Sequence, residues 1–181
     1  RQMGPDIAVE ISTAPSRQLV GDVAEGRLDA ALVGETVDPA RFASVPLWTE
    51  ELLLVADRGQ DRLRSARAVR GRALLVFKNG CAYRVRLEQW LMAAGIVPQR
   101  VIELPSYHAI LASAAAETGV GVVPRSVLEG IPGAEAVSRH PLPGRIGRIT
   151  IQFIGLHSRP SPARERLAAV LKQNAATLGT R

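Results

Sequence analysis

The sequence has a single cysteine, Cys81, so an internal disulfide framework is excluded and a reducing compartment fits best. No window approaches the run of about 18 apolar residues that a membrane-spanning helix needs. The first residues, RQMGPDIAVEIS, lack the cationic start and apolar core of a secretory signal. We therefore expect a cytoplasmic protein with no membrane association.

Aromatic residues and lysine are also scarce. There are three Phe, two Trp and two Tyr, and the only lysines are Lys78 and Lys172. The net charge of +6 is therefore carried by arginines, which are spread along the chain without a dense block. Binding to nucleic acid through charge calls for a clustered basic stripe with interleaved aromatics. We interpret the arginines as solvated side chains on several faces and expect no direct DNA contact from this segment.

The usual enzyme motifs are missing. The sequence has no G-x-S-x-G, no P-loop and no dinucleotide fingerprint, and its three histidines lack metal-ligand spacing. Cys81 and His108 could in principle form a dyad, but no third group at a recognisable motif would orient the histidine. We expect no catalytic residue, no metal and no cofactor.

What the sequence does contain is short apolar runs that alternate with helical periodicity, which indicates an α/β fold with a mostly parallel sheet. We expect strands at residues 6–11, 28–33, 51–56, 73–77, 100–104, 119–123 and 148–157, and helices at 16–26, 82–94, 106–117, from 126 and from 161. The first two strands and the helix between them would form a right-handed βαβ unit. Polar residues 58–71 indicate a connector between lobes, and residues 131–144, rich in Pro and Gly, indicate a surface loop.

Several helix ends carry specific signals. Ser16, Ser106 and Ser161 each stand where an N-cap is expected, and Pro162 occupies the favoured first helical position. Gly95 would end the helix that starts at residue 82.

Four segments resemble one family in order and spacing. They are VEISTAPSRQLVGDVAEGRLDAALVG, PLWTEELLLVA, GVGVVPRSVLEG and SPARERLAAVL. The most specific piece is EGRLDAAL, in which Gly26 and Asp29 match the family's G-x-L-D signature. The chain is similar, over essentially its whole length, to the effector-binding domain of bacterial LysR-type transcriptional regulators.

The resemblance implies a two-lobed α/β fold like that of type 2 periplasmic binding proteins, with two crossover strands and a small molecule held between the lobes. Lobe I would be residues 1–57 and 148–181, and lobe II residues 58–147. Passages near residues 56–61 and 148–153 would act as hinges. The winged helix-turn-helix domain, and the first strand and most of the first helix of the effector domain, would lie outside this sequence.

One position departs from the family pattern. Glu117 stands where the family usually has the first glycine of a G-x-G before the strand that ends at Pro124. A glutamate disfavours a left-handed helix cap, so we expect the turn there to differ.

Ligands of open α/β sheets bind at the carboxyl ends of the strands. After the first strand, the resemblance places an effector-contacting hydroxyl at Ser16, with Thr13 close by. Ser16 could equally cap its own helix, and the two roles are compatible. After the strand expected at residues 100–104, Ser106 matches a position that faces the effector in the family, and Tyr107 is its neighbour.

The segment FKNGCAYR lies at another strand end. Its candidate effector-binding residues are Lys78, Asn79, Gly80, Cys81 and Arg84. The amides from about Gly80 to Tyr83 would be free first-turn donors, which favour an anion. Arg84 would either support that anion or pair with Glu88 one turn later.

These observations predict a ligand-sensing regulatory domain that binds a small, anionic metabolite. The full-length protein would be a dimer or tetramer of identical subunits and would bind DNA through its amino-terminal domain. Two alternatives stay open: a periplasmic solute-binding protein of the same fold, and a small enzyme dependent on Cys81.

Overall fold

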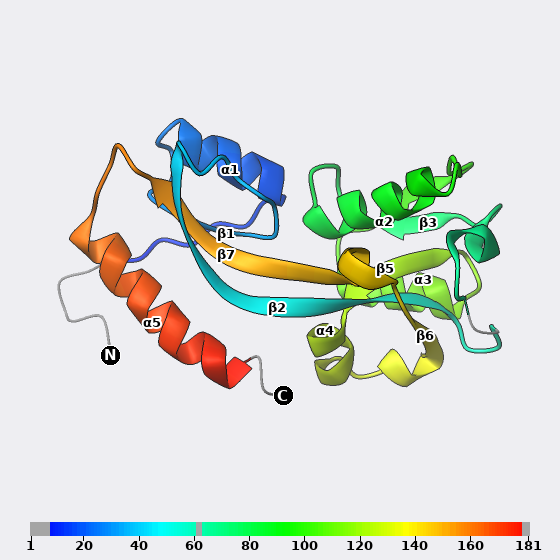
Figure 1. Ribbon diagram of the computed structural model, residues 1–181. Coiled ribbons are helices and arrows are strands. Elements are labelled where there is room, and N and C mark those ends of the chain that lie inside the picture. The colour runs from blue at the N-terminus through cyan, green and yellow to red at the C-terminus, as the bar shows by residue number, and fades with distance from the viewer. Residues whose placement is uncertain (1–7, 61–62, 179–181) are drawn as a thin grey trace. The chain divides into compact units, whose positions relative to one another are not determined.

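The computed structural model describes residues 8–60 and 63–178 and divides the chain into two compact units (Figure 1). Unit 1 comprises residues 1–49 and 150–181, and unit 2 comprises residues 50–149. Strands β2 (Phe42–Asp57) and β7 (Arg148–Leu156) carry the chain from one unit to the other. The first boundary therefore falls within β2, earlier than the expected lobe boundary after Asp57.

Unit 1 is built around α1 (Ser16–Ala24), β1 (Ala31–Val33) and part of β7. β1 pairs antiparallel with β7, with Leu32 opposite Phe153. Val23, Val33, Phe42 and Ile154 are buried together in the core of this unit. The helix α5 (Pro162–Leu178) begins as predicted, because the Ser161 Oγ accepts a hydrogen bond from the Arg164 amide at 3.3 Å.

The first predicted strand is wrong in the part that the structure describes. Residues 8–11 form no strand and are exposed, with Ile11 84% and Val9 51% accessible, and Asp6 and Ile7 lie outside the described residues. The predicted parallel βαβ unit is wrong too, because β1 takes the antiparallel strand β7 as its partner. β-propensity alone cannot hold a strand that has no neighbour to take its backbone hydrogen bonds.

Unit 2 contains a mixed sheet rather than a mostly parallel one. Its strands are β3 (Leu74–Val76), β4 (Val101–Glu103), β5 (Val120–Pro124), β6 (Val137–Pro141) and the second half of β2. β3 pairs parallel with both β4 and β5, whereas β2 pairs antiparallel with β5 and with β6. The predicted parallel strands are therefore correct as strands, but the segment that enters from unit 1 runs against them.

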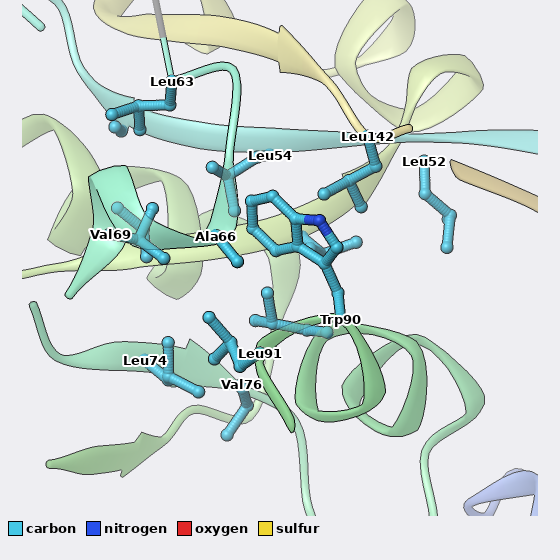
Figure 2. Close-up of a cluster of buried hydrophobic side chains, with 14 of the residues drawn as sticks. Leu52, Leu54, Leu63, Ala66, Val69, Leu74, Val76, Trp90, Leu91 and Leu142 are labelled. Atoms are coloured by element: carbon cyan, nitrogen blue, oxygen red, sulfur yellow. The ribbon is translucent and has the colours of Figure 1, made fainter. Parts of the chain in front are cut away.

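The apolar run of β2 is buried on both faces, as its sequence predicts. Leu52, Leu54 and Ala56 pack with α2 (Ala82–Ala93), whose Trp90 indole lies among Leu54, Ala66 and Leu142 (Figure 2). The alternate side chains of β2 pack with α3 (Tyr107–Ala115) and α4 (Arg125–Gly130) in a second cluster. The Ser106 N-cap of α3 is confirmed, because its Oγ accepts from the Ala109 amide at 3.2 Å.

Two segments that were predicted to be irregular are instead part of the packed structure of unit 2. Residues 58–71, expected as a connector, contain a 3-10 helix (Ala66–Val69). The side chains of Leu63, Ala66 and Val69 in this segment are buried in the core. Residues 131–144, expected as a surface loop, contain β6, two 3-10 helices (Ala134–Ala136 and the start of Gly144–Gly147) and the buried His140. In both, a few regularly placed apolar side chains reach the core while the polar majority faces solvent.

The turn at Glu117 keeps the left-handed conformation that a glycine would favour. Glu117 has φ +60°, the only positive φ of a non-glycine residue among those described. Its amide donates to the Ala114 carbonyl at 3.0 Å, and the Thr118 amide donates to the Ser113 carbonyl at 3.0 Å. These two bonds form a Schellman motif, so the expectation of a different turn is wrong. The motif satisfies two carbonyl groups at the end of α3, despite the backbone strain at Glu117.

Replacing Glu117 with Gly should stabilise the domain by about 1 kcal/mol, because glycine adopts a positive φ without the Cβ clash. Glu117→Ala keeps the Cβ and is the matched control, with no comparable gain expected. Urea unfolding followed by tryptophan fluorescence measures both. Equal stability of the two variants would contradict the strain argument.

Candidate functional site

Three strand ends of unit 2 meet at one edge of its sheet. Because β3 runs parallel to β4 and β5, the residues that follow these strands lie on the same side. These residues are the loop 77–81, the turn at residues 104–106 and the start of α4 at Arg125. Lys78, Cys81 and Ser106, predicted from separate stretches of sequence, are therefore placed at a common edge.

The amino terminus of α2 lies at this edge without a side-chain cap. Cys81 occupies the N-cap position and makes no capping hydrogen bond, and Gly80 supplies the positive φ of +89° that the turn requires. The Cys81 amide donates to the Lys78 carbonyl at 3.2 Å. The prediction that this amide is free is therefore wrong. The amides of Ala82, Tyr83 and Arg84 have no acceptor among the described residues, which leaves three donors in the first turn of the helix.

Arg84 is held by carboxylates of unit 2. Its Nε donates to Glu88 at 2.8 Å, and its Nη1 donates to Glu103 at 2.6 Å and to the Phe77 carbonyl at 3.2 Å. Of the two interpretations of Arg84, the pairing with Glu88 is the one present here. The nearby carboxylates raise its pKa against the opposing effect of burial, which is the largest single influence. Two anions offset its charge, so it contributes little positive potential to the edge.

Lys78 and Asn79 are exposed in the same loop. Neither side chain forms a hydrogen bond or ion pair with another residue in the described part of the chain. Lys78 is therefore the cation at this edge whose charge is not offset by a described carboxylate.

Tyr83 and Tyr107 lie close enough at this edge for each hydroxyl to affect the pKa of the other. Phe77 packs edge-on against Tyr107, with ring centroids 4.9 Å apart. Burial, reinforced by the negative charge of Glu50, raises the pKa of Tyr83 to about 12. Burial likewise raises the pKa of Tyr107, helped by Tyr83. Tyr83 is also partly buried and packs against the apolar cluster that contains Leu87 and Trp90 of α2.

Glu50 and Ser126 belong to this edge but do not stand out in the sequence. The Ser126 Oγ donates to a Glu50 carboxylate oxygen at 2.8 Å. Their meeting follows from strand register, because β2 and β5 pair antiparallel with Leu52 opposite Pro124. Only that pairing could have revealed the contact in advance.

The predicted site residues of unit 1 lie near the start of α1. Ser16 is the first helical residue rather than the N-cap, because the Pro15 carbonyl already accepts the Leu19 amide. The predicted capping role of Ser16 is therefore wrong, and its Oγ instead accepts from the Gly34 amide at 3.4 Å. Thr13 is exposed in the preceding segment. Nearby, the Gln152 side chain donates to the Glu35 carbonyl.

Two α/β units that share two passing strands define a periplasmic-binding-protein-like domain of the two-lobed, type 2 class. The family described as LysR substrate binding domain matches residues 1–176, and the chain belongs to that family. The fold class predicted from the sequence is thereby confirmed.

Named relatives agree with this assignment. The chain is 29% identical over 150 residues to the HTH-type transcriptional regulator CzcR of Bacillus cereus, covering 83% of this chain and 51% of that protein. It thus spans about half the length of that curated relative. Among solved structures, the regulatory domain of Synechocystis PCC6803 CcmR in complex with 2-PG superposes with a TM-score of 0.78 at 16% identity, covering 94% of this chain and 85% of that one.

The effector-binding domain of QuiR in complex with shikimate superposes with a TM-score of 0.71 at 13% identity, covering 91% of this chain and 79% of that one. At these identities the structures establish the fold alone. None of the helices that the structure describes combines the length and apolar character that crossing a bilayer requires. Within residues 8–60 and 63–178, no group of His, Cys, Asp or Glu side chains could hold a metal ion.

The two tyrosines make the alkaline behaviour of this edge measurable, since the chain has no others. Their folded-state pKa values lie above the value of about 10 for an unfolded tyrosine, so unfolding releases protons above that pH. The free energy of unfolding should therefore fall as the pH rises from about 10 towards 12.

Ultraviolet titration of tyrosinate measures the effect, with the guanidinium-unfolded chain as the control that titrates near pH 10. Tyr83→Phe should leave a single, still elevated transition in the folded protein. Normal titration of both tyrosines while the domain remains folded would refute the buried pair.

Proposed function

We propose that this chain is a sensor that binds a small anionic metabolite at the carboxyl ends of the unit 2 strands, an edge that we call the effector edge. Family membership supports a ligand-sensing regulatory role. The observation that supports an anion is the uncapped start of α2, where three unpartnered amides and the helix dipole follow the loop that carries Lys78. Ser106 and Tyr107 would contribute from the same edge, and the contacts expected from Thr13 and Ser16 stay predictions.

The same edge favours a ligand that also carries a hydrogen-bond donor. Glu50 and the two tyrosine oxygens are acceptors beside the start of α2. A bare anion would meet the repulsion of Glu50, whereas a hydroxyl or amino group on the same molecule would offset it. CcmR in complex with 2-PG and QuiR in complex with shikimate show that domains of this fold hold small ligands.

Binding would be transmitted through the lobes. A ligand shifts the balance between two lobe arrangements only by binding one of them more strongly than the other. We expect the change in lobe arrangement to occur by bending of β2 and β7, the two strands shared by the units.

We also propose that the full-length protein is a cytoplasmic DNA-binding regulator and a homo-oligomer. The curated relatives are HTH-type transcriptional regulators, and the chain spans about half their length. Met92, Val97 and Val101 are exposed at the end of α2 and along β4, which pairs only with β3 among the described strands. A second copy of the chain is the partner that such an apolar edge would suit.

The coding sequence upstream of residue 1 tests the whole-protein proposal directly. It should encode a helix-turn-helix pattern followed by a long helix. A secretory signal there would overturn the regulator and favour a periplasmic solute-binding protein of the same fold.

Lys78 and Lys172 provide a matched test of the anion, because they are the only lysines and both are exposed. Thermal-shift screening against organic acids and their neutral amides should find stabilisation by acids only. Isothermal titration of the best acid should then show binding to Lys78→Gln weakened roughly two- to fivefold.

Lys172→Gln, in unit 1 on α5, is the control and should bind like the unaltered protein. The anion hypothesis fails if neutral amides stabilise as well as the acids and Lys78→Gln binds normally. Turnover of a bound compound that is lost in Cys81→Ser would instead point to the enzyme alternative.

A further inference from the structure

Unit 2 has a polar concavity at the opposite ends of the same parallel strands. This hollow has a volume of about 610 Å³, is open to solvent on one side, and is lined by residues that precede β3, β4 and β5, including Arg72, Arg100 and Gly119. The carboxyl ends of these strands lead to the effector edge, so this hollow lies at the other edge of the sheet. Its volume is within the range of about 300–1,000 Å³ that small-molecule sites occupy.

The floor of the hollow is packed backbone. A Cβ on Gly119 would lie 2.3 Å from a backbone oxygen at the start of β3, so only glycine fits at this position. The amide of the next residue donates to that same oxygen at 2.9 Å. The floor at this point is therefore formed by packed backbone.

Two of the four charges in the lining neutralise each other. The Arg72 Nη1 donates to the Asp57 carboxylate at 3.2 Å, and its Nη2 donates to the Gln60 side chain. Both partners of this ion pair are largely shielded, with 31% of the Arg72 side chain and 18% of the Asp57 side chain exposed. Arg72 is thereby held in place and has little net charge to offer a ligand.

The other two charges have no such partners. Neither the Arg100 guanidinium nor the Glu117 carboxylate makes a hydrogen bond or ion pair with another described residue. With respect to the described residues, the hollow thus presents one unpaired cation and one unpaired anion, and the two carboxylates around it disfavour a polyanion such as nucleic acid.

Glu117 is the strained residue of the described chain, at φ +60°. Glycine would make the same turn at lower free energy. The glutamate therefore costs some stability, and it brings a carboxylate to the hollow. Strained residues of this kind gather at ligand sites.

We propose that this hollow is a second ligand site, for a small zwitterion of the α-amino-acid class. The ligand carboxylate pairs with Arg100 and its ammonium group with Glu117. This site is separate from the effector edge, and it goes beyond the proposed function.

Backbone amide NMR spectra of the domain, titrated with L-glutamine, test the proposal. The neutral side chain of this probe leaves its two α-charges as the features that matter. Saturable shifts are expected at Arg100 and Gly119. Shifts confined to Ala82 and Tyr83 would place the amino acid at the effector edge and overturn the second site, as would the absence of any saturable shift.

Variants separate recognition from folding. Arg100→Gln and Glu117→Gln should each weaken L-glutamine binding by about tenfold or more, because each removes a charge-assisted contact. Arg145→Gln, an exposed arginine outside the hollow, is the matched control and should bind normally. Glu117→Gly should bind weakly although it is more stable, a combination that a purely structural role for Glu117 does not produce.

Two further probes check the charges. N-acetyl-L-glutamine lacks the ammonium group, and L-glutamine amide lacks the carboxylate. The affinity of each derivative should be lower than that of L-glutamine by a factor of about ten or more. Binding of either derivative as tight as that of L-glutamine, or unchanged binding to Glu117→Gln, would overturn the zwitterion assignment. These results do not depend on Lys78, so the second site and the proposed effector function can fail separately.

Discussion

Unit 2 depends on the burial of β2 on both faces between Leu52 and Ala56. Alternate side chains of this run enter two different clusters, one with α2 and the other with α3 and α4. The run also pairs with β5 on one side and with β6 on the other. These pairings fix the residues that lie next to each end of the run. Glu50 comes beside Ser126 and the tyrosine pair, and Asp57 comes beside Arg72.

The two edges of the unit 2 sheet consequently differ in chemistry. At the carboxyl ends of β3, β4 and β5, an uncapped helix start and Lys78 lie next to the acceptors of Glu50 and two tyrosines. At the amino ends, Arg100 and Glu117 lie in a concavity whose other charges are already paired. One set of parallel strands thus carries two polar surfaces whose ligands would differ in charge.

Much of the local structure was predictable because its causes are local. Ser106 caps α3 and Ser161 caps α5 through bonds to amides three residues away, and the spacing of Leu87, Trp90 and Leu91 places one face of α2 in the core. The failures have non-local causes. His140 lies in a stretch rich in Pro and Gly, yet it is buried because β6 pairs with β2, and composition does not report such a pairing.

The α/β class, most element positions and the family could all be read from the amino-acid order, because periodicity, caps and short motifs act over a few residues. The candidate residues at the strand ends came from the same source. The folded chain was needed to establish that Arg84 is paired with Glu88 and Glu103. It was needed equally to show that Ser16 bonds to Gly34 and that Glu50 joins the effector edge. Strand register and packing bring together residues far apart in the chain. These contacts determine which charged side chains are already paired and which remain able to pair with a ligand.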